Sequence, residues 1–296
     1  MTAEPLVLWC DDLDRAVAVL TELGLRLDVI IPADAPRVAE LSRGDVAMRL
    51  TRRVEAPPVE IGRAGMSYRD LLPDRVGGHF IASHITIADG GPVPDYVHHH
   101  DIRFQVIHCV RGWVRLVYED QGPPFVLEAG DTVLQPPHIR HRVLESSPGL
   151  EVLEVSSPAE HATMVEHDIE LPTTAVTPDR DFGGQRFVRH RLADATWLPW
   201  RGAQFEAADT GIETATDGLA AVRTVRATAA GAASEPARHD GELVLWFVED
   251  GSAVLQLDAE VRPFARNDAV AVPPGVTFGL ADASANLRLV EVALPG

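Results

Sequence analysis

Short runs of alternating apolar and polar residues make up most of the chain beyond about residue 60. Residues 80–87 (FIASHITI) and 113–118 (WVRLVY) are two of these runs, and turn residues separate them from their neighbours. Alternation with a period of two predicts strands that bury one face. The 22 prolines and 23 glycines fit many turns between short strands. We therefore predict a mainly β protein.

The first 52 residues follow a different pattern. Residues 5–9 form an apolar run, and Asp11 or Asp12 can cap a helix that ends near Gly24. Three alternating segments follow, at residues 25–31, 37–41 and 46–50. The predicted order is strand, helix and three strands, and the helix has apolar residues at helical spacing on one face: Leu13, Ala16, Val17 and Leu20.

This order, headed by the segment DDLDRAVAVLTELGL, resembles one βαβββ half of the glyoxalase (vicinal oxygen chelate) fold. That family usually builds a metal site from two such halves, with a histidine near the start of the first strand. The first strand here, LVLWC, contains no histidine. We therefore interpret residues 1–55 as a structural or dimerising module, or as a lid on its neighbour. Residues 56–60 (APPVE) are predicted to be a linker.

An internal repeat appears when the chain is shifted by about 139 residues. Gly112 then falls on Gly251, and an offset shorter by two places Pro136 and Pro137 on Pro273 and Pro274. Two copies of one β-barrel explain this pattern. We predict barrels at residues 62–160 and 201–296, with a connector at 161–200.

Three histidines in the first copy have the spacing of a metal site. His98 and His100 are two residues apart, so on a strand their side chains share one face. A return strand can bring His141 beside them, and Gln105 can enter from the following strand. Three imidazoles leave coordination positions open, which is typical of a catalytic rather than a closed structural site.

The same residues resemble the two cupin motifs. In cupins, His-x-His is followed by Glu and Gly, and a second motif runs from Gly through Pro to His. Here His98-x-His100, Gln105 and Gly112 match the first motif, with Gln105 in place of Glu. The second motif is matched by Gly130, Pro136 and His141. The resemblance implies a bicupin of two jelly-roll barrels, with a divalent metal on His98, His100 and His141. Gln105 either completes this set of ligands or, because an amide is a weaker ligand than a carboxylate, only hydrogen-bonds a metal-bound water.

The second copy lacks the ligands. At the four corresponding positions it has Ala237, His239, Val244 and Phe278. One imidazole cannot hold a metal by itself, so we predict a structural partner. The same barrel can evidently be built without the histidines.

Other polar residues lie close to the metal motifs in sequence. Because Gln105 carries no charge, a general base would have to be His138, His108 or Glu154, and we name His138 and Glu154 as catalytic candidates. An arginine at the cavity mouth would pair with a substrate carboxylate. Candidate substrate-binding residues are His84, Tyr96, Arg103 and Arg140, whereas His99 should face away from the ligands.

Composition excludes several classes of function. The net charge of −18 disfavours nucleic acid and anionic membranes as partners, and the 26 basic residues include no lysine. Lysine Schiff-base chemistry and phosphate-loop binding are therefore excluded. Cys10 and Cys109 form no disulfide framework, and the N-terminus does not resemble a signal peptide. We expect a cytoplasmic protein, and the resemblance to bicupins implies a homodimer.

Three functions remain open. Similarity to bicupin and three-histidine dioxygenases implies an Fe(II) dioxygenase acting on a small anionic, metal-chelating substrate. Three neutral imidazoles and an amide leave about two positive charges on the site, which favours an anionic bidentate ligand. One alternative is an oxygen-independent isomerase, lyase or hydrolase using Zn(II), Ni(II) or Mn(II). The other is a non-catalytic, metal-dependent binding protein.

Overall fold

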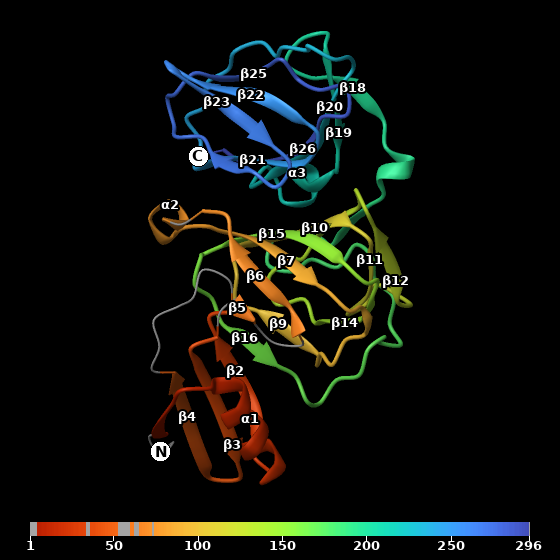
Figure 1. Ribbon diagram of the computed structural model, residues 1–296. Coiled ribbons are helices and arrows are strands. Elements are labelled where there is room, and N and C mark those ends of the chain that lie inside the picture. The colour runs from red at the N-terminus through yellow and green to blue at the C-terminus, as the bar shows by residue number, and fades with distance from the viewer. Residues whose placement is uncertain (1–4, 34–35, 53–59, 62–64, 73, 296) are drawn as a thin grey trace.

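The computed structural model describes residues 5–33, 36–52, 60–61, 65–72 and 74–295, and is mainly β. Three parts follow one another along an elongated molecule (Figure 1). The N-terminal unit lies at one end, a first β-unit in the middle, and a second β-unit at the other end. Most of the predicted linker at 56–60 lies outside the described residues. No helix within the described ranges is long and apolar enough to span a membrane.

The N-terminal unit has the predicted order of strand, helix and three strands. The side chain of Asp12 caps the helix by accepting a 2.9 Å hydrogen bond from the Arg15 backbone N–H. Leu13 on the helix packs with Leu41 and Leu50 of the sheet in a small core. The elements are β1 (Leu6–Cys10), α1 (Leu13–Glu22), β2 (Arg26–Ile31), β3 (Val38–Arg43) and β4 (Val46–Arg52).

The sheet of this unit continues into the first β-unit. Its strand order is β1-β4-β3-β2-β16-β9-β14-β11-β12, with β8 paired to β14. Strand β16 (Thr163–Val165) lies antiparallel between β2 and β9 (His98–His100). In Figure 1 this green strand bridges the red and orange parts of the chain. The segment at 161–200, predicted to be a connector, thus supplies a strand beside the histidines.

A second sheet faces this one in the first β-unit. Its strand order is β17-β13-β10-β15-β7-β6-β5, and an apolar core with a cavity lies between the two sheets. The remaining elements of this unit are β5 (Glu60–Ile61), β6 (Ser67–Asp70), α2 (Arg75–Gly78), β7 (Ile81–Ile87), β8 (Gly91–Pro92), β10 (Phe104–Arg111), β11 (Trp113–Tyr118), β12 (Phe125–Glu128), β13 (Thr132–Leu134), β14 (His141–Ser146), β15 (Leu150–Ser157) and β17 (Val188–His190).

The second β-unit repeats the strand pairing of the first. Its β21 pairs with β24 and β26 as β10 pairs with β13 and β15, and β22 pairs with β23 and β25 as β11 pairs with β12 and β14. The same strand pairing thus occurs in both copies of the repeat predicted from the sequence. Its elements are η2 (Leu192–Asp194), β18 (Trp197–Pro199), β19 (Phe205–Asp209), α3 (Ile212–Ala215), β20 (Ala221–Ala227), β21 (Leu243–Asp250), β22 (Ser252–Leu257), β23 (Glu260–Ala265), β24 (Ala269–Ala271), β25 (Phe278–Ala281) and β26 (Arg288–Leu294).

Aromatic rings and an arginine fill the interior of the second unit. Phe278, at the position that corresponds to His141, is buried against Trp246. The guanidinium carbon of Arg201 lies 4.6 Å from the Phe278 ring centroid, and its Nη2 lies 3.1 Å from Oε2 of Glu291. His239 donates from Nε2 to the Val272 carbonyl. A fixed cation and its carboxylate thus lie where the first unit has its histidines.

The two β-units meet across an apolar interface that contains a buried ion pair. Strands β10 and β15 of the first unit pack on β21 and β26 of the second through residues such as Val106 and Leu245. Within this interface, His108 Nε2 lies 2.6 Å from Oε1 of Glu249. Arg288 donates to the other oxygen of Glu249 at 2.7 Å.

Candidate metal centre

The first unit contains a cavity between its two sheets. About 590 Å³ of space, the open mouth included, lies between the lining atoms. One wall comes from β9, β11 and β14, and the other from β6, β7, β10 and β15. The lining is His98, His100, His141, Gln135, Glu154, Tyr68 and nine apolar residues: Met66, Ile85, Ile87, Ile107, Val114, Leu116, Val143, Leu150 and Val152.

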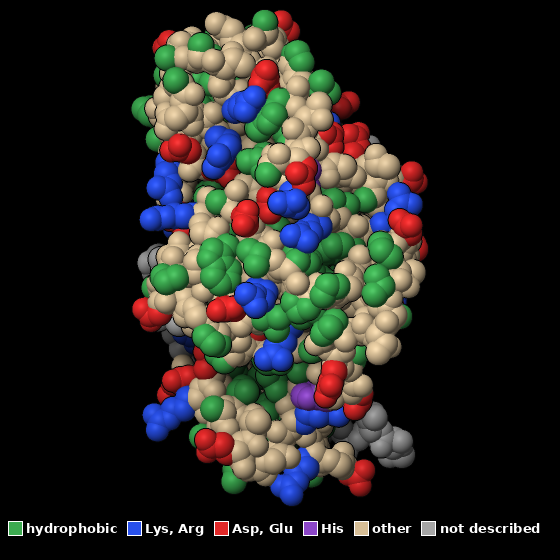
Figure 2. Space-filling model, turned by 90° about the vertical axis from the view of Figure 1, so that its right-hand side faces the viewer, with side chains coloured by type: hydrophobic (Ala, Val, Ile, Leu, Met, Phe, Trp, Pro, Cys, Tyr) green, Lys and Arg blue, Asp and Glu red, His purple; other side chains and the backbone are tan. Residues whose placement is uncertain are grey.

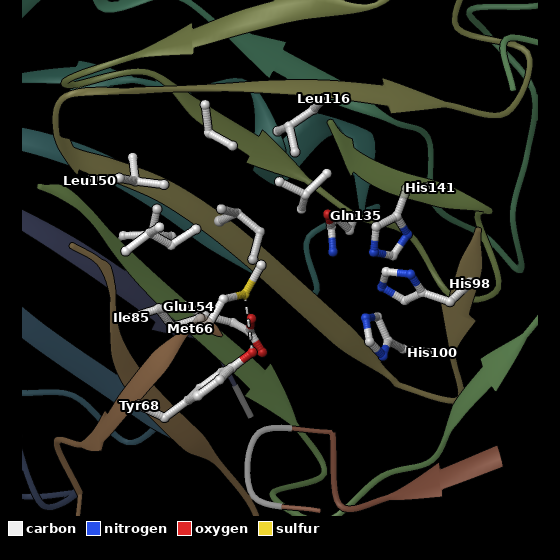
Figure 3. Close-up of a pocket in the computed structure, with 15 residues that line it drawn as sticks. Met66, Tyr68, Ile85, His98, His100, Leu116, Gln135, His141, Leu150 and Glu154 are labelled. Carbon is white, nitrogen blue, oxygen red and sulfur yellow. Dashed lines mark hydrogen bonds between the residues drawn. The ribbon is translucent and has the colours of Figure 1, made fainter. Parts of the chain in front are cut away.

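Three histidines gather at one side of this cavity (Figure 3). His98 and His100 lie on β9, and His141 begins β14, where it pairs directly with His98. One ring nitrogen from each lies within 4.8 Å of the other two, and all three side chains are buried. A single ion can therefore contact all three imidazoles, as the sequence spacing predicts.

The backbone fixes the tautomers of two of these rings. Nδ1 of His98 lies 2.8 Å from the Tyr96 carbonyl, and Nδ1 of His141 lies 3.0 Å from the Ile139 carbonyl. A carbonyl can only accept, so Nδ1 carries the proton and the lone pair is on Nε2. This is the protonation state that a metal ligand requires, and such outer hydrogen bonds orient the ring.

The third ring is held by the strand that comes from the predicted connector. Nδ1 of His100 lies 3.0 Å from Oγ1 of Thr163, which is completely buried on β16. The hydroxyl can accept from Nδ1, which again leaves Nε2 to the metal. All three rings thus fit a divalent ion that takes nitrogen ligands.

We expect Thr163→Val to weaken metal binding by about tenfold, the lower end of the effect of removing a partner behind a histidine ligand. Valine keeps the shape of threonine and removes only the hydrogen-bond acceptor of His100. Competition with a fluorescent chelator measures the dissociation constant. Thr163→Ser keeps the hydroxyl and should bind close to the wild-type value, whereas equal weakening in both variants would show that packing is responsible.

A chain of hydrogen bonds, each donated in the same direction, leads from Tyr118 to Glu154, the acidic residue that lines the cavity. The Tyr118 hydroxyl donates to Gln135 at 2.6 Å, Gln135 donates to Gln105 Oε1 at 2.7 Å, and Gln105 Nε2 donates to Glu154 Oε1 at 3.1 Å. Burial, with the nearby Glu154 charge adding to it, raises the pKa of Tyr118, so its hydroxyl remains a donor. The chain therefore has one consistent direction, from the phenol to the carboxylate.

Gln105 occupies the middle of that chain. Its oxygen accepts from Gln135 and its nitrogen donates to Glu154, so the two ends of the amide are already engaged. Gln105 is also not among the side chains that line the cavity. Its assignment as a metal ligand stays a prediction, and the contacts favour a role in orienting Glu154.

Comparisons with known proteins give matches of fold only. No protein-family model matches the chain, and no curated protein matches its sequence. Among solved structures, oxalate decarboxylase OxdC from Bacillus subtilis has a TM-score of 0.57 at 15% identity, over 80% of this chain and 74% of that one. A variant of salicylate 1,2-dioxygenase from Pseudoaminobacter salicylatoxidans gives 0.55 at 15% identity, over 73% and 70%. The protein Ylba from E. coli gives 0.54 at 11%, over 81% and 86%.

The chain has a cupin fold. At identities of 11–15% this likeness establishes the architecture and leaves the activity open.

The cupin fold does not bring most of the other predicted residues to the cavity. His84 lies on the opposite face of β7 from Ile85, with Nε2 3.2 Å from Glu151 and its ring beside Phe247 of the second unit. Arg103 forms a bidentate ion pair with Glu242 across the interface between the units.

The remaining predicted residues lie near the metal histidines but outside the cavity lining. Arg140 is paired with Glu119 and Glu166. Tyr96 contributes its carbonyl to His98, and its ring packs edge-on against the His98 ring. His138 is exposed, with Nε2 3.9 Å from Asp101. Of the catalytic and substrate-binding candidates, Glu154 alone lines the cavity in the described part of the chain.

The sequence analysis did not identify four residues that line the cavity or hold the residues around it. Tyr68 and Gln135 line the cavity, Tyr118 orients Gln135, and Thr163 holds His100. Gln135 had a weak signal, because it directly precedes the Pro136–Pro137 pair of the second motif. Tyr68 and Thr163 had none, since their positions depend on pairings between distant strands.

Proposed function

We propose that this chain is a metal-dependent bicupin enzyme, an Fe(II) dioxygenase that acts on a small anionic organic substrate able to chelate the metal. The observation that carries the proposal is the arrangement of three buried imidazoles, each anchored through Nδ1, beside an apolar cavity. Anchored imidazoles with open positions between them are typical of catalytic rather than structural metal sites.

The domain arrangement belongs to the same proposal. Residues 1–55 would be a glyoxalase-like βαβββ module, 62–160 the metal-binding cupin, 161–200 a connector and 201–296 a second cupin without a metal site. The repeated strand pairing and the packed interior around Phe278 support two cupin units, and the connector adds β16 and β17 to the sheets of the first. The second cupin would then act as a structural partner.

The ligands determine what binds beside the metal. His98, His100 and His141 would hold the ion, and being neutral they leave its two positive charges uncompensated. An ion such as Fe(II) supplies electron transfer between a chelated organic substrate and dioxygen. Both oxygen atoms would then enter the product, with dioxygen as the oxidant. The cavity walls orient the substrate and exclude water.

Glu154 would accept the proton that a substrate hydroxyl or enol loses on becoming an anion. Its carboxylate lies on the wall formed by β15, which faces the wall that carries the histidines. The donor chain from Tyr118 through Gln105 fixes one carboxylate oxygen. A carboxylate oriented in this way is the group that would receive the proton.

Metal analysis and oxygen uptake of anaerobically purified protein test the proposal. We expect close to one iron per chain and oxygen consumption that depends on an added catechol or diketone. Zinc, nickel or manganese with no oxygen uptake would favour an isomerase, lyase or hydrolase instead. Bound metal with ligand binding but no turnover would favour a binding protein. Absence of any metal, even after reconstitution, would contradict all three.

A further inference from the structure

The two walls of the cavity differ in chemistry. The wall with β9, β11 and β14 carries the three histidines together with Val114, Leu116 and Val143. The facing wall carries Glu154 and Tyr68 among aliphatic side chains. In Figure 3 the imidazoles lie together at one side, and apolar side chains such as Leu150 and Ile85 fill the other side. A substrate that chelates the metal through its anionic head would therefore place the rest of the molecule, its body, in contact with apolar side chains.

No arginine lines this cavity in the part of the chain that the structure describes. The two arginines nearest to the metal motifs in sequence are held elsewhere, Arg103 by Glu242 and Arg140 by Glu119 and Glu166. Acidic and basic side chains are interspersed over the face in Figure 2, as expected for arginines paired at the surface. A carboxylate on the substrate body would find no cationic partner and would lose its hydration.

Of the two polar residues on the facing wall, Glu154 is an acceptor, whereas the Tyr68 hydroxyl donates to Met66 Sδ at 3.4 Å. Glu154 is oriented by Gln105 and also accepts from the Ser156 hydroxyl at 3.3 Å. A second carboxylate in the cavity would therefore meet a like charge in addition to its own desolvation. Like charges brought together in a recess strongly disfavour the wrong ligand.

From this lining we propose that the site selects chelators with a single anionic head and an uncharged, apolar body, and that Glu154 rejects a second carboxylate on that body. The inference rests on the proposed function, because the head is assumed to bind the metal. It narrows the substrate class from small anions in general to hydrophobic chelators. Short dicarboxylates fall outside that class.

Two catechols of nearly equal shape test this selectivity. Propylcatechol and dihydroxyphenylpropionate share the same chelating head, and the second has a carboxylate where the first has a terminal methyl group. Zinc-loaded protein binds without redox turnover, so isothermal titration calorimetry reports affinity alone. We expect propylcatechol to bind at least about tenfold more tightly. Equal affinity, tighter binding of the carboxylate, or no binding of either catechol would overturn the inference.

The Glu154→Gln variant separates the charge of Glu154 from simple desolvation. It should reduce the preference for propylcatechol over dihydroxyphenylpropionate by about threefold or more, because both catechols lose the same proton from the chelating head and only the second meets the like charge of Glu154. If the ratio of the two dissociation constants did not change, Glu154 would not contribute to this selectivity. Zinc stoichiometry is measured first: a protein that binds no zinc would overturn the proposed function and this inference together. A zinc-loaded protein without the catechol preference would overturn the inference alone.

Discussion

Replacing His141 with alanine is expected to lower metal affinity at least a hundredfold, so that the purified variant retains almost no metal. Among the residues that the structure describes, this imidazole is one of three groups that converge on the proposed ion. Its loss should exceed the ~10–100-fold effect of removing an outer hydrogen-bond partner. Metal content after dialysis, and affinity by chelator competition, measure the change.

His99 provides the matched control for this variant. It lies between two of the ligands in sequence, but its side chain points to the other face of β9, where Nδ1 lies 3.2 Å from Glu166. His99→Ala should keep the wild-type metal content. If His99→Ala and His141→Ala lost metal equally, or if His141→Ala kept it, the assignment of the three ligands would be wrong. Thermal unfolding of metal-free proteins checks that both variants fold.

The parts of the fold that depend on local pattern were predictable from the sequence. Asp12 caps α1 because a short acidic side chain before a helical apolar stripe can accept a backbone N–H at close range. The repeat was predictable for a similar reason. Residues that fix turns recur at nearly the same offset: Gly112 and Gly251, for example, correspond in the two copies and both have positive φ.

Contacts between distant segments were not predictable. Nothing in the local sequence of Thr163 indicates that β16 inserts between β2 and β9, because a three-residue strand is defined only by its partners. The continuous sheet from the N-terminal unit to the metal strand depends on this insertion. It places Thr163 behind His100, so the segment predicted to be a connector also takes part in the site.

The residues of the candidate site also fall into those that the local sequence predicts and those that depend on distant partners. His98 and His100 follow from the alternation of a strand, and His141 from the return strand. Whether the other candidates reach the cavity depends on their side-chain partners. Arg103 and Arg140 had suitable chemistry and lay close to the motifs in sequence, but ion pairs with Glu242 and Glu166 hold them outside the cavity. Only Glu154 among the non-ligand candidates has a side chain that the strand register directs inward, on the rung that pairs it with Ile107.

The second unit shows how the same scaffold is stable without a metal. Phe278 replaces His141, and the guanidinium of Arg201 stacks on its ring while pairing with Glu291. Glu291 occupies the position on β26 that Glu154 has on β15, at the same offset that relates Phe278 to His141. A permanent side-chain cation thus compensates the buried carboxylate there. In the first unit, the proposed metal and a hydrogen-bond chain would have that role.

Replacing Glu249 with glutamine is expected to destabilise the protein by about 3 kcal/mol at neutral pH, because removal of one member of a buried pair leaves an uncompensated charge. Both side chains of the His108–Glu249 pair are fully buried between the units, and Arg288 holds the other carboxylate oxygen. Burial alone would raise the pKa of Glu249, but the charges and hydrogen bonds of His108 and Arg288 outweigh it and lower that pKa. The shift of the chemical or thermal unfolding midpoint measures the loss.

The lowered pKa of Glu249 also predicts the pH dependence of this effect. A carboxyl group with a depressed pKa in the folded state stabilises fully above its ordinary value of 4.5, and this stabilisation is lost as the pH falls through the folded-state pKa. The wild-type protein should therefore lose its advantage over Glu249→Gln only in acid, below about pH 4.5. Glu242→Gln breaks the exposed pair with Arg103 across the same interface and should cost less than about 1 kcal/mol, because solvent screens exposed pairs. Similar small losses in both variants would show that the buried pair does not hold the two units together.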